Sequence, residues 1–277
     1  MIKIFIFALT NFMMKKILLT FSFSLVQILA YGQKTIDFEF SYPENSNFVI
    51  EQSTNTSGTM KITGSPQEIA SLKKAGYNQI RKLKYVVDYS SVYKTGKKLT
   101  DSFPFEFYYS NVSYDIDSDG KKQKREGGFP NAIIKGNYID GKPVVVQNSD
   151  VQAANDLPKY FLYNFPKITN MKVGDSFTTD RSMESKNGGA SVSGILKYTL
   201  TKIEDNSALF SIAITQNSNK SSEINLKGSG TGEMVYNLKD KYIELEKMTI
   251  NMTSSVAGTV KMNVDNTIIS TYKLILK

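Results

Sequence analysis

The chain has 277 residues, of which 40% are hydrophobic and 22% charged, and its formal net charge is +8 at pH 7. This composition is that of a globular protein and excludes disordered and collagen-like chains. The sequence contains no His, Cys or Trp. It therefore excludes Ser-His-Asp triads, cysteine nucleophiles, disulfides and metal sites built on imidazole or thiolate.

The first segment, residues 1–32, has the layout of a secretory signal peptide. A basic pair at residues 15–16 precedes a mostly apolar run at residues 17–29, and small residues within the tripeptide at 30–32 precede Gln33. This order of regions is typical of a signal that is removed by a peptidase. We therefore expect an exported protein, periplasmic or secreted, whose mature chain begins near Gln33.

Two alternatives concern this segment. Met13 or Met14 is an alternative start, because the apolar stretch before them adds nothing that a signal needs. A membrane anchor is the other alternative, but the run after Lys16 has roughly 13 residues, against the roughly 20 that span a bilayer. A longer span over residues 2–30 would place Lys15 and Lys16 near its middle, where charge is costly. We expect cleavage and no stable membrane span afterwards.

The mature chain is mildly basic. Removal of residues 1–32 takes away Lys3, Lys15 and Lys16 and no acid, so the net charge falls from +8 to +5. Much of the excess lies in one run, KKQKR at residues 121–125. Such a run is typical of a solvated hairpin tip, and no nucleic-acid motif or aromatic stacking platform accompanies it. We expect no nucleic-acid partner.

The first predicted element of the mature chain is a short helix, Pro66–Ala75. Ser65 is a suitable N-cap, Pro66 occupies the first helical position, and Glu68 lies in the first turn. Gly76 can end the helix.

Alternation with a period of two dominates the remaining sequence. β-Branched and aromatic residues in this pattern predict half-buried strands, and the short connections between them predict an antiparallel meander. We therefore predict a mainly β fold, a curved antiparallel sheet or partial barrel with two short helices. The clearest alternating segments are residues 103–109, 196–200, 210–214, 248–252, 256–264 and 272–276.

The second helix is predicted over Asp150–Phe165, where apolar residues including Phe161 and Phe165 recur at four-residue spacing. No linker or internal repeat divides the chain. The sequence thus predicts a single β-rich domain over residues 33–277, with two lobes hinged near residues 150–175 as the alternative.

Three glycines, Gly228, Gly230 and Gly232, alternate along one predicted strand. Such spacing favours a bend in the sheet or the close approach of another element. The alternative interpretation is a bare floor for a ligand.

The second half of the chain resembles a known family. The segments that carry the resemblance are PKI and KVGDSF within residues 166–177, SGILKYTL at 193–200 and KGSGTGEMVY at 227–236. They are similar to an uncharacterised family of exported β-rich proteins, a domain of unknown function, from Bacteroidota-type bacteria. Phe177 stands where that family often has Trp. The resemblance implies a compartment and a fold, and it implies no catalytic residue because the family has no assigned activity.

Residues 115–126 match the calcium-loop pattern D-x-D-x-D-G-x5-E. The flanking strands and the nearby cations count against such a loop, and the alternative is a hairpin that turns at Asp119-Gly120. If the loop forms, we expect weak Ca²⁺ binding. Its ligands would be carboxylates and one backbone carbonyl, from Asp115, Asp117, Asp119, Lys121 and Glu126.

Aromatic residues at alternate positions, together with the predicted aromatic helix, suggest an elongated apolar groove suited to acyl chains. The alternative is that the same residues form the core. A small cavity would favour the core, and an open channel of several hundred Å³ would favour a carrier. The candidate lining residues are Phe103, Phe105, Phe107, Phe161 and Phe165.

These observations predict a non-catalytic exported envelope protein that needs no cofactor and binds an apolar ligand or a partner protein. One alternative function is a weak calcium-binding surface module. The other is a carboxylate-based hydrolase, because paired carboxylates are the remaining general acid–base option in a chain without His. Glu244 and Glu246, at alternate positions of one predicted strand, are the candidate pair.

Overall fold

The computed structural model describes residues 34–100, 102–127, 133–139, 142–146, 165–181, 192–218, 224–256, 258 and 260–277. The chain divides into two units, Met1–Thr35 and Ile36–Lys277. Only Lys34 and Thr35 of the first unit are described, so the fold below is that of the second unit. The predicted signal peptide, residues 1–32, lies outside the described residues.

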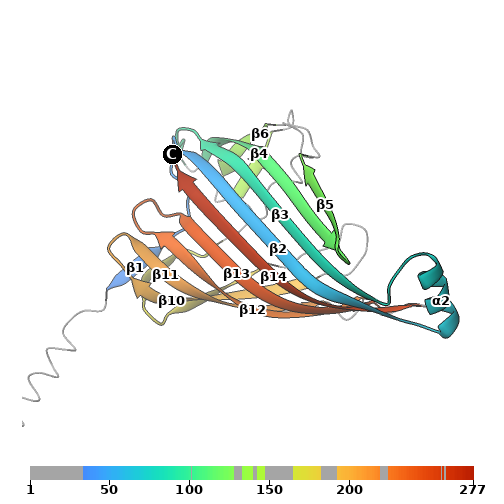
Figure 1. Ribbon diagram of the computed structural model, residues 1–277. Coiled ribbons are helices and arrows are strands. Elements are labelled where there is room, and N and C mark those ends of the chain that lie inside the picture. The colour runs from blue at the N-terminus through green and yellow to red at the C-terminus, as the bar shows by residue number, and fades with distance from the viewer. Residues whose placement is uncertain are drawn as a thin grey trace, which may run out of the picture. The chain divides into compact units, whose positions relative to one another are not determined.

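Most described residues form β-strands, as the alternation predicts (Figure 1). One face of each strand packs in a core while the other meets solvent, and this requires a period of two. In chain order the strands are β1 (Thr35–Phe38), β2 (Asn47–Thr63), β3 (Ile80–Thr95), β4 (Ser102–Ser118), β5 (Lys121–Glu126), β6 (Ile134–Ile139), β7 (Lys142–Val145), β8 (Ile168–Lys172), β9 (Ser176–Asp180), β10 (Val192–Ile203), β11 (Ser207–Ser218), β12 (Ile224–Asn237), β13 (Ile243–Val256) and β14 (Lys261–Leu276).

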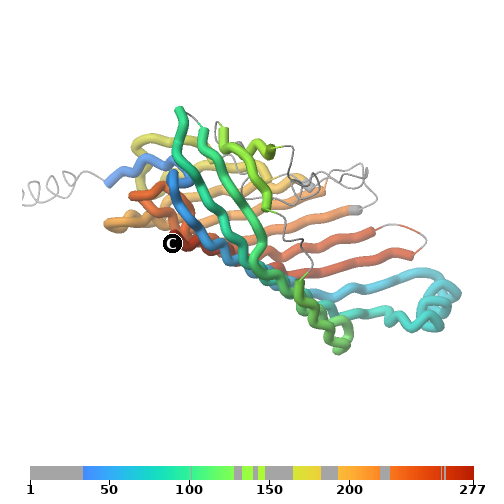
Figure 2. Tube along the Cα trace, turned by 90° about the horizontal axis from the view of Figure 1, so that it is seen from above, coloured from blue at the N-terminus to red at the C-terminus, as the bar shows by residue number. Residues whose placement is uncertain are grey.

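The strands form one 12-stranded sheet in the order β7-β6-β4-β3-β2-β14-β13-β12-β11-β10-β9, with β5 also paired to β4. Its ladders are antiparallel, and β1 and β8 form a separate two-stranded sheet. Because β2 pairs with β14 near the middle, the large sheet consists of a β2–β7 wing and a β9–β14 wing. The sheet is curved (Figure 2), and no ladder of the described residues joins β7 to β9. The predicted curved antiparallel sheet is confirmed, and it is open.

The predicted first helix is α2 (Pro66–Lys74), which connects β2 to β3 (Figure 1). Ser65 caps it as expected: its side chain accepts a hydrogen bond from the Glu68 amide, and the Glu68 carboxylate accepts one from the Ser65 amide. The predicted second helix, Asp150–Phe165, lies outside the described residues except for Phe165, which is in neither a helix nor a strand. No helix in the described ranges is long and apolar enough to cross a membrane.

The buried side chains form two clusters on one face of the sheet, which we call the inner face. One cluster lines the β9–β14 wing together with residues of β1 and β8, and the other lines the β2–β7 wing. Phe40 and Tyr272 pack against both clusters. The largest fully buried aromatic members are Phe38, Tyr198, Phe210 and Tyr236 in the first cluster and Phe48, Tyr93 and Phe107 in the second.

Each long central strand has two halves that differ in burial. We call the end that carries the clusters the core half. The other end, the open half, comprises β5 and residues 54–63 of β2, 80–89 of β3, 112–118 of β4, 252–256 of β13 and 261–269 of β14. Within these ranges only Ile62 and Val112 are buried.

The alternating glycines of β12 allow β13 to approach closely. A Cβ at Gly230 would lie 2.2 Å from the carbonyl oxygen of Thr249, and one at Gly232 would lie 2.4 Å from that of Lys247. A side chain at either position would force the two strands apart. The close approach that the glycine spacing predicts is therefore present.

Candidate functional site

The inner face of the open half is rich in apolar side chains that remain partly exposed in the described part of the chain. The ladder register places these residues on the same face as the buried clusters, since Phe48 pairs with Tyr93 and, eight positions further along the same ladder, Thr56 pairs with Tyr85. Successive inward positions then carry Met60, Leu83, Tyr85, Val87, Tyr114, Ile116, Met252, Met262, Val264 and Ile268.

The outer face of the same half is mostly polar. Because side chains alternate across a strand, every second residue of these segments points away from the inner face. The inner face of the open half is thus more apolar than its outer face. The outward positions include Asn55, Ser57, Thr59, Lys82, Lys84, Asp88, Thr253, Asn263, Asp265 and Thr267.

An open hollow of about 620 Å³ lies where β3, β4 and β5 meet in the open half. The Tyr85 and Tyr114 rings lie side by side on its wall, with centroids 6.2 Å apart and planes at 30°. Partial burial, and to a smaller extent the neighbouring Tyr114, raises the pKa of the Tyr85 hydroxyl above its usual value of 10.0. The hollow is lined by Tyr85, Tyr114, Ile116, Arg125, Glu126 and Gly127.

Strand β5 adds positive charge to this end of the inner face. Arg125 pairs with the inward-facing Tyr114, and Lys121, four residues earlier, lies on the same face. Lys124 and Glu126 point to the outer face, where Lys124 Nζ lies 3.1 Å from the Glu126 carboxylate. The hairpin thus separates a pair of inward cations from an outward ion pair.

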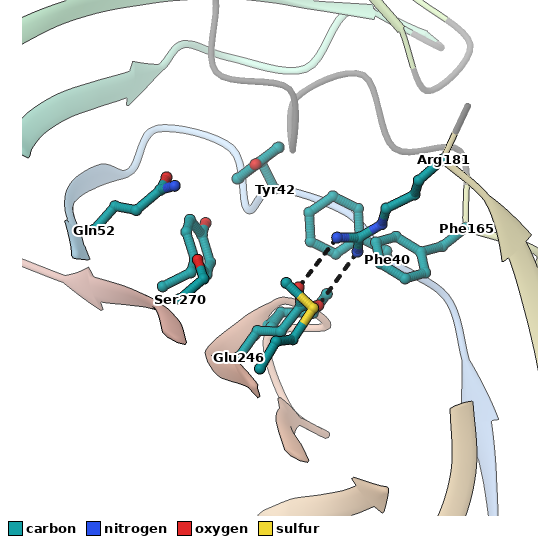
Figure 3. Close-up of a pocket in the computed structure, with 10 residues that line it drawn as sticks. Phe40, Tyr42, Gln52, Phe165, Arg181, Glu246 and Ser270 are labelled. Carbon is teal, nitrogen blue, oxygen red and sulfur yellow. Dashed lines mark hydrogen bonds and ion pairs between the residues drawn. The ribbon is translucent and has the colours of Figure 1, made fainter. Parts of the chain in front are cut away.

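A small cavity of about 60 Å³ lies at the opposite end of the inner face, in the core half (Figure 3). Arg181, directly after β9, and Glu246 of β13 meet at its wall. Arg181 Nη1 donates to Glu246 Oε1 at 3.2 Å, and Nη2 donates to Oε2 at 3.3 Å. The Glu246 side chain is buried and that of Arg181 is largely so, with exposed fractions of 7% and 11%. Such a fork-to-fork pair fixes geometry as well as charge.

Tyr198 of β10 completes this polar cluster. Its hydroxyl accepts a hydrogen bond from Arg181 Nη2 at 2.5 Å and donates to Glu246 Oε2 at 3.3 Å. Gln52, on the same wall, has a buried side-chain oxygen without a hydrogen-bond partner in the described part of the chain. Since a water molecule occupies about 30 Å³ in the liquid, this cavity suits a few waters or a small polar group and is too small for an acyl chain.

The aromatic residues predicted to line a groove occupy different places. Phe103, Phe105 and Phe107 are buried in the cluster of the β2–β7 wing. This is the alternative interpretation of the sequence, in which these residues form the core. Phe165 packs against the other cluster and borders the small cavity, and Phe161 lies outside the described residues. The described members of this set are therefore divided between two clusters and do not form one groove.

Sequence reasoning missed the inner face of the open half. The signal was present in residues 81–89, where Leu83, Tyr85, Val87 and Tyr89 alternate with residues of which three out of four are charged. No sequence signal pointed to the Arg181–Glu246 pair, because strands β10, β11 and β12 lie between β9 and β13 in the sheet. Only a curved sheet brings these two side chains together.

The calcium-loop segment forms the hairpin that was its alternative interpretation. Asp119 and Gly120 have positive φ angles of 54° and 84°, as a two-residue hairpin turn requires. The ladder continues from Ser118–Lys121 to Ser113–Glu126, which places Glu126 about 17 Å along the strands from the turn. The Asp119 carboxylate instead accepts hydrogen bonds from the Lys82 amide and Arg81 Nε. Asp115, Asp117, Asp119, Lys121 and Glu126 are thus spread along the hairpin.

The proposed carboxylate pair is separated by a bulge in β13. Tyr236 pairs with Ile243 and Val235 with Leu245, so Glu244 is the extra residue between them. Its carboxylate accepts a hydrogen bond from the Asn237 side chain at 2.7 Å, while Glu246 faces the cavity. Glu246 is therefore the one carboxylate on the described wall of that cavity.

Comparisons with known proteins give no family for this chain. No family model matches it, and no curated protein matches it in sequence. An outer membrane channel from Pseudomonas putida F1 aligns with a TM-score of 0.27 and 7% identity, over 85% of this chain and 97% of the channel. OccK7 (OpdD) of Pseudomonas aeruginosa aligns with a TM-score of 0.27 and 4% identity, over 83% of this chain and 99% of its own. Such low TM-scores do not indicate a common fold, and membership of the exported family stays a prediction.

Proposed function

We propose that the protein is a non-catalytic, exported envelope protein that holds the apolar chain of a ligand against the inner face of its open half. The observation that carries the proposal is the contrast between the two faces of this half, apolar on the inner side and mostly polar on the outer side. The signal-peptide layout of residues 1–32 supports export to the periplasm or the medium.

The size of the surface fits an extended chain. From Thr54 to Ile62, the inner face of β2 runs for about 26 Å at the usual rise per residue. Each methylene group that a ligand buries on such a surface contributes about 0.8 kcal/mol. A flexible linear chain can follow the twist of the strands and cover the partly exposed side chains of several strands. The small cavity in the core half closes one end of this path.

Native mass spectrometry of the protein produced from the full-length chain and purified after export tests the proposal. We expect a co-purifying apolar adduct that organic solvent extracts. We also expect the protein to enhance the fluorescence of the neutral apolar dye N-phenyl-1-naphthylamine. A clean apo mass together with no dye binding would contradict the proposal and direct attention to partner proteins.

Two neighbouring valines of β3 offer a matched pair of variants. Val87 points to the inner face and Val86 to the outer face, and both are partly buried. Val87→Asp should abolish dye binding because a carboxylate on the inner face is costly to desolvate, whereas Val86→Asp should retain it. Circular dichroism shows whether both variants fold. Equal dye binding by two folded variants would place the ligand elsewhere.

A further inference from the structure

The charges of the open half are sorted between its two faces. On the inner face lie Arg81, Lys121 and Arg125, and no carboxylate of the described residues shares their inward positions. The carboxylates of Asp88, Asp115 and Glu126 lie at outward positions of the same strands.

The inward cations differ in what they already bind. Arg81 donates to the turn residues, with Nε 3.1 Å from the Asp119 carboxylate and Nη2 2.6 Å from the Ser118 hydroxyl. Arg125 lies instead on the wall of the 620 Å³ hollow, beside Tyr114 and Ile116. Glu126 also borders this hollow, and its carboxylate is paired with Lys124. The guanidinium of Arg125 is thus the cation that adjoins the apolar surface.

We infer that the ligand is an anionic amphiphile and that Arg125 binds its head group at the β5 end of the inner face. This inference rests on the proposed function. A guanidinium presents paired N–H donors that match a carboxylate or phosphate. Tyr114 and Ile116, on the same wall of the hollow, place apolar surface beside this guanidinium. Lys121, on the same face, adds positive charge.

The other end of the inner face is unsuited to an anion. Arg181 is already neutralised there by the two carboxylate oxygens of Glu246, and the adjoining cavity measures only about 60 Å³. A head group at that end would lie against an ion pair that is largely removed from solvent, whereas the Glu126 carboxylate near Arg125 is exposed and pairs with Lys124. The chain of the amphiphile is therefore directed from β5 toward the core half, with its charged end at the open edge.

Competition for the bound dye tests the head group. The probes are hexadecanoate, hexadecyl phosphate and hexadecanol, each used below the concentration at which it forms micelles or separates from water. They share one chain length and differ in charge, and the two anions distinguish a carboxylate from a phosphate ligand. We expect at least one anion to displace N-phenyl-1-naphthylamine at a concentration about tenfold lower than hexadecanol, as a charge-assisted contact predicts.

Two variants of β5 assign this preference to one side chain. Arg125→Gln should raise the concentration at which the anions displace the dye to that of hexadecanol. Lys124→Gln is the matched control, because it removes the same charge one residue away on the outer face, and it should keep the preference. Circular dichroism establishes that both variants fold.

The outcomes separate the inference from the proposed function. If hexadecanol displaces the dye as well as both anions do, the inference is overturned and the proposed function stands. If the two variants lose the preference equally, the attraction comes from the overall basic charge, and the role of Arg125 is overturned. If neither the dye nor any of the three chains binds, the proposed function and the inference fail together.

Discussion

The two halves of the sheet share the same strands and the same alternation but differ in what covers them. On β2, Phe48 and Ile50 are fully buried, whereas Thr54, Thr56 and Met60 on the same face remain partly exposed. In the core half, aromatic side chains from other elements cover the inner face. Alternation therefore identifies the inner face of a strand but does not tell whether that face is covered.

The covering of the core half can be followed at Phe38 of β1. Its ring lies 4.8 Å from that of Phe177, 5.5 Å from that of Phe210 and 4.9 Å from that of Tyr236, measured between centroids. These contacts join β1 to the β9–β14 wing. In the described part of the open half, Tyr85 and Tyr114 contact each other at the rim of an open hollow. The core half thus holds packed aromatic side chains, whereas the open half leaves most of its inner side chains partly exposed.

The largest expected effect compares two aromatic residues of β4. Phe107 is fully buried in the core half and Tyr114 is partly exposed in the open half. Phe107→Ala should lower the free energy of unfolding by about 3–5 kcal/mol, because it leaves a cavity in a packed cluster. Tyr114→Ala should cost roughly 1 kcal/mol or less while weakening dye binding. Urea denaturation followed by circular dichroism measures both, and similar losses would show that the open half is core after all.

A somewhat smaller effect is expected at the Arg181–Glu246 pair. Glu246→Gln should destabilise the protein by roughly 3 kcal/mol, because it leaves the Arg181 charge buried without its counter-ion. The double variant Arg181→Met with Glu246→Leu should recover most of the loss, since well-packed apolar residues replace such pairs at little cost. The same denaturation experiment applies. A double variant no more stable than Glu246→Gln would contradict a structural role of the ion pair.

The smallest effect is expected at Glu39, which links the core half to two lysines. Hydrogen bonds from Lys167 and Lys241 hold the pKa of its carboxyl below the usual 4.5. The ionised form is therefore favoured in the folded state, so its contribution is present above pH 4.5 and is lost as the pH falls through the lowered pKa. Glu39→Gln should cost less than about 1 kcal/mol at pH 7, because the site is partly exposed. Unfolding curves of the wild type and of Glu39→Gln measure this cost, which should disappear as the pH falls from neutral to acidic. A difference in the free energy of unfolding that stays constant with pH would contradict the ion pairs.

Much of the fold could be predicted because its signals are local. The capping of α2 by Ser65 depends on neighbouring residues, and the turn at Asp119-Gly120 follows from its own sequence. The alternation in residues 103–109 correctly marks the buried face of β4. Beyond Tyr109 a bulge shifts the register, since Ser91 pairs with Tyr109 and Ser90 with Asn111. This shift transfers the inner face to even-numbered residues, and simple alternation does not reveal it.

The candidate site was harder to predict because it depends on tertiary arrangement. The predicted groove relied on the strongly apolar residues Phe103, Phe105 and Phe107, which are buried in the core cluster of the β2–β7 wing. The exposed inner face is built instead of Tyr, Met and Val side chains spaced among polar residues. Arg125 stood out only as part of a basic run, and the ladder was needed to separate it from Lys124. The burial of Glu246 depends on Arg181, which is close in space and distant in sequence.

The ladder between β2 and β14 has a consequence for how the chain folds. It pairs Thr63 with Lys261 and Phe48 with Leu276, so the two wings become hydrogen-bonded to each other through residues far apart in the chain. Each wing is mainly a meander of sequential neighbours and can form early, while joining them must wait for a long loop to close. Until then β2 and β14 are both free edges, which are prone to pair with other chains. We therefore expect slow folding, with aggregation from a half-assembled sheet as its main competitor.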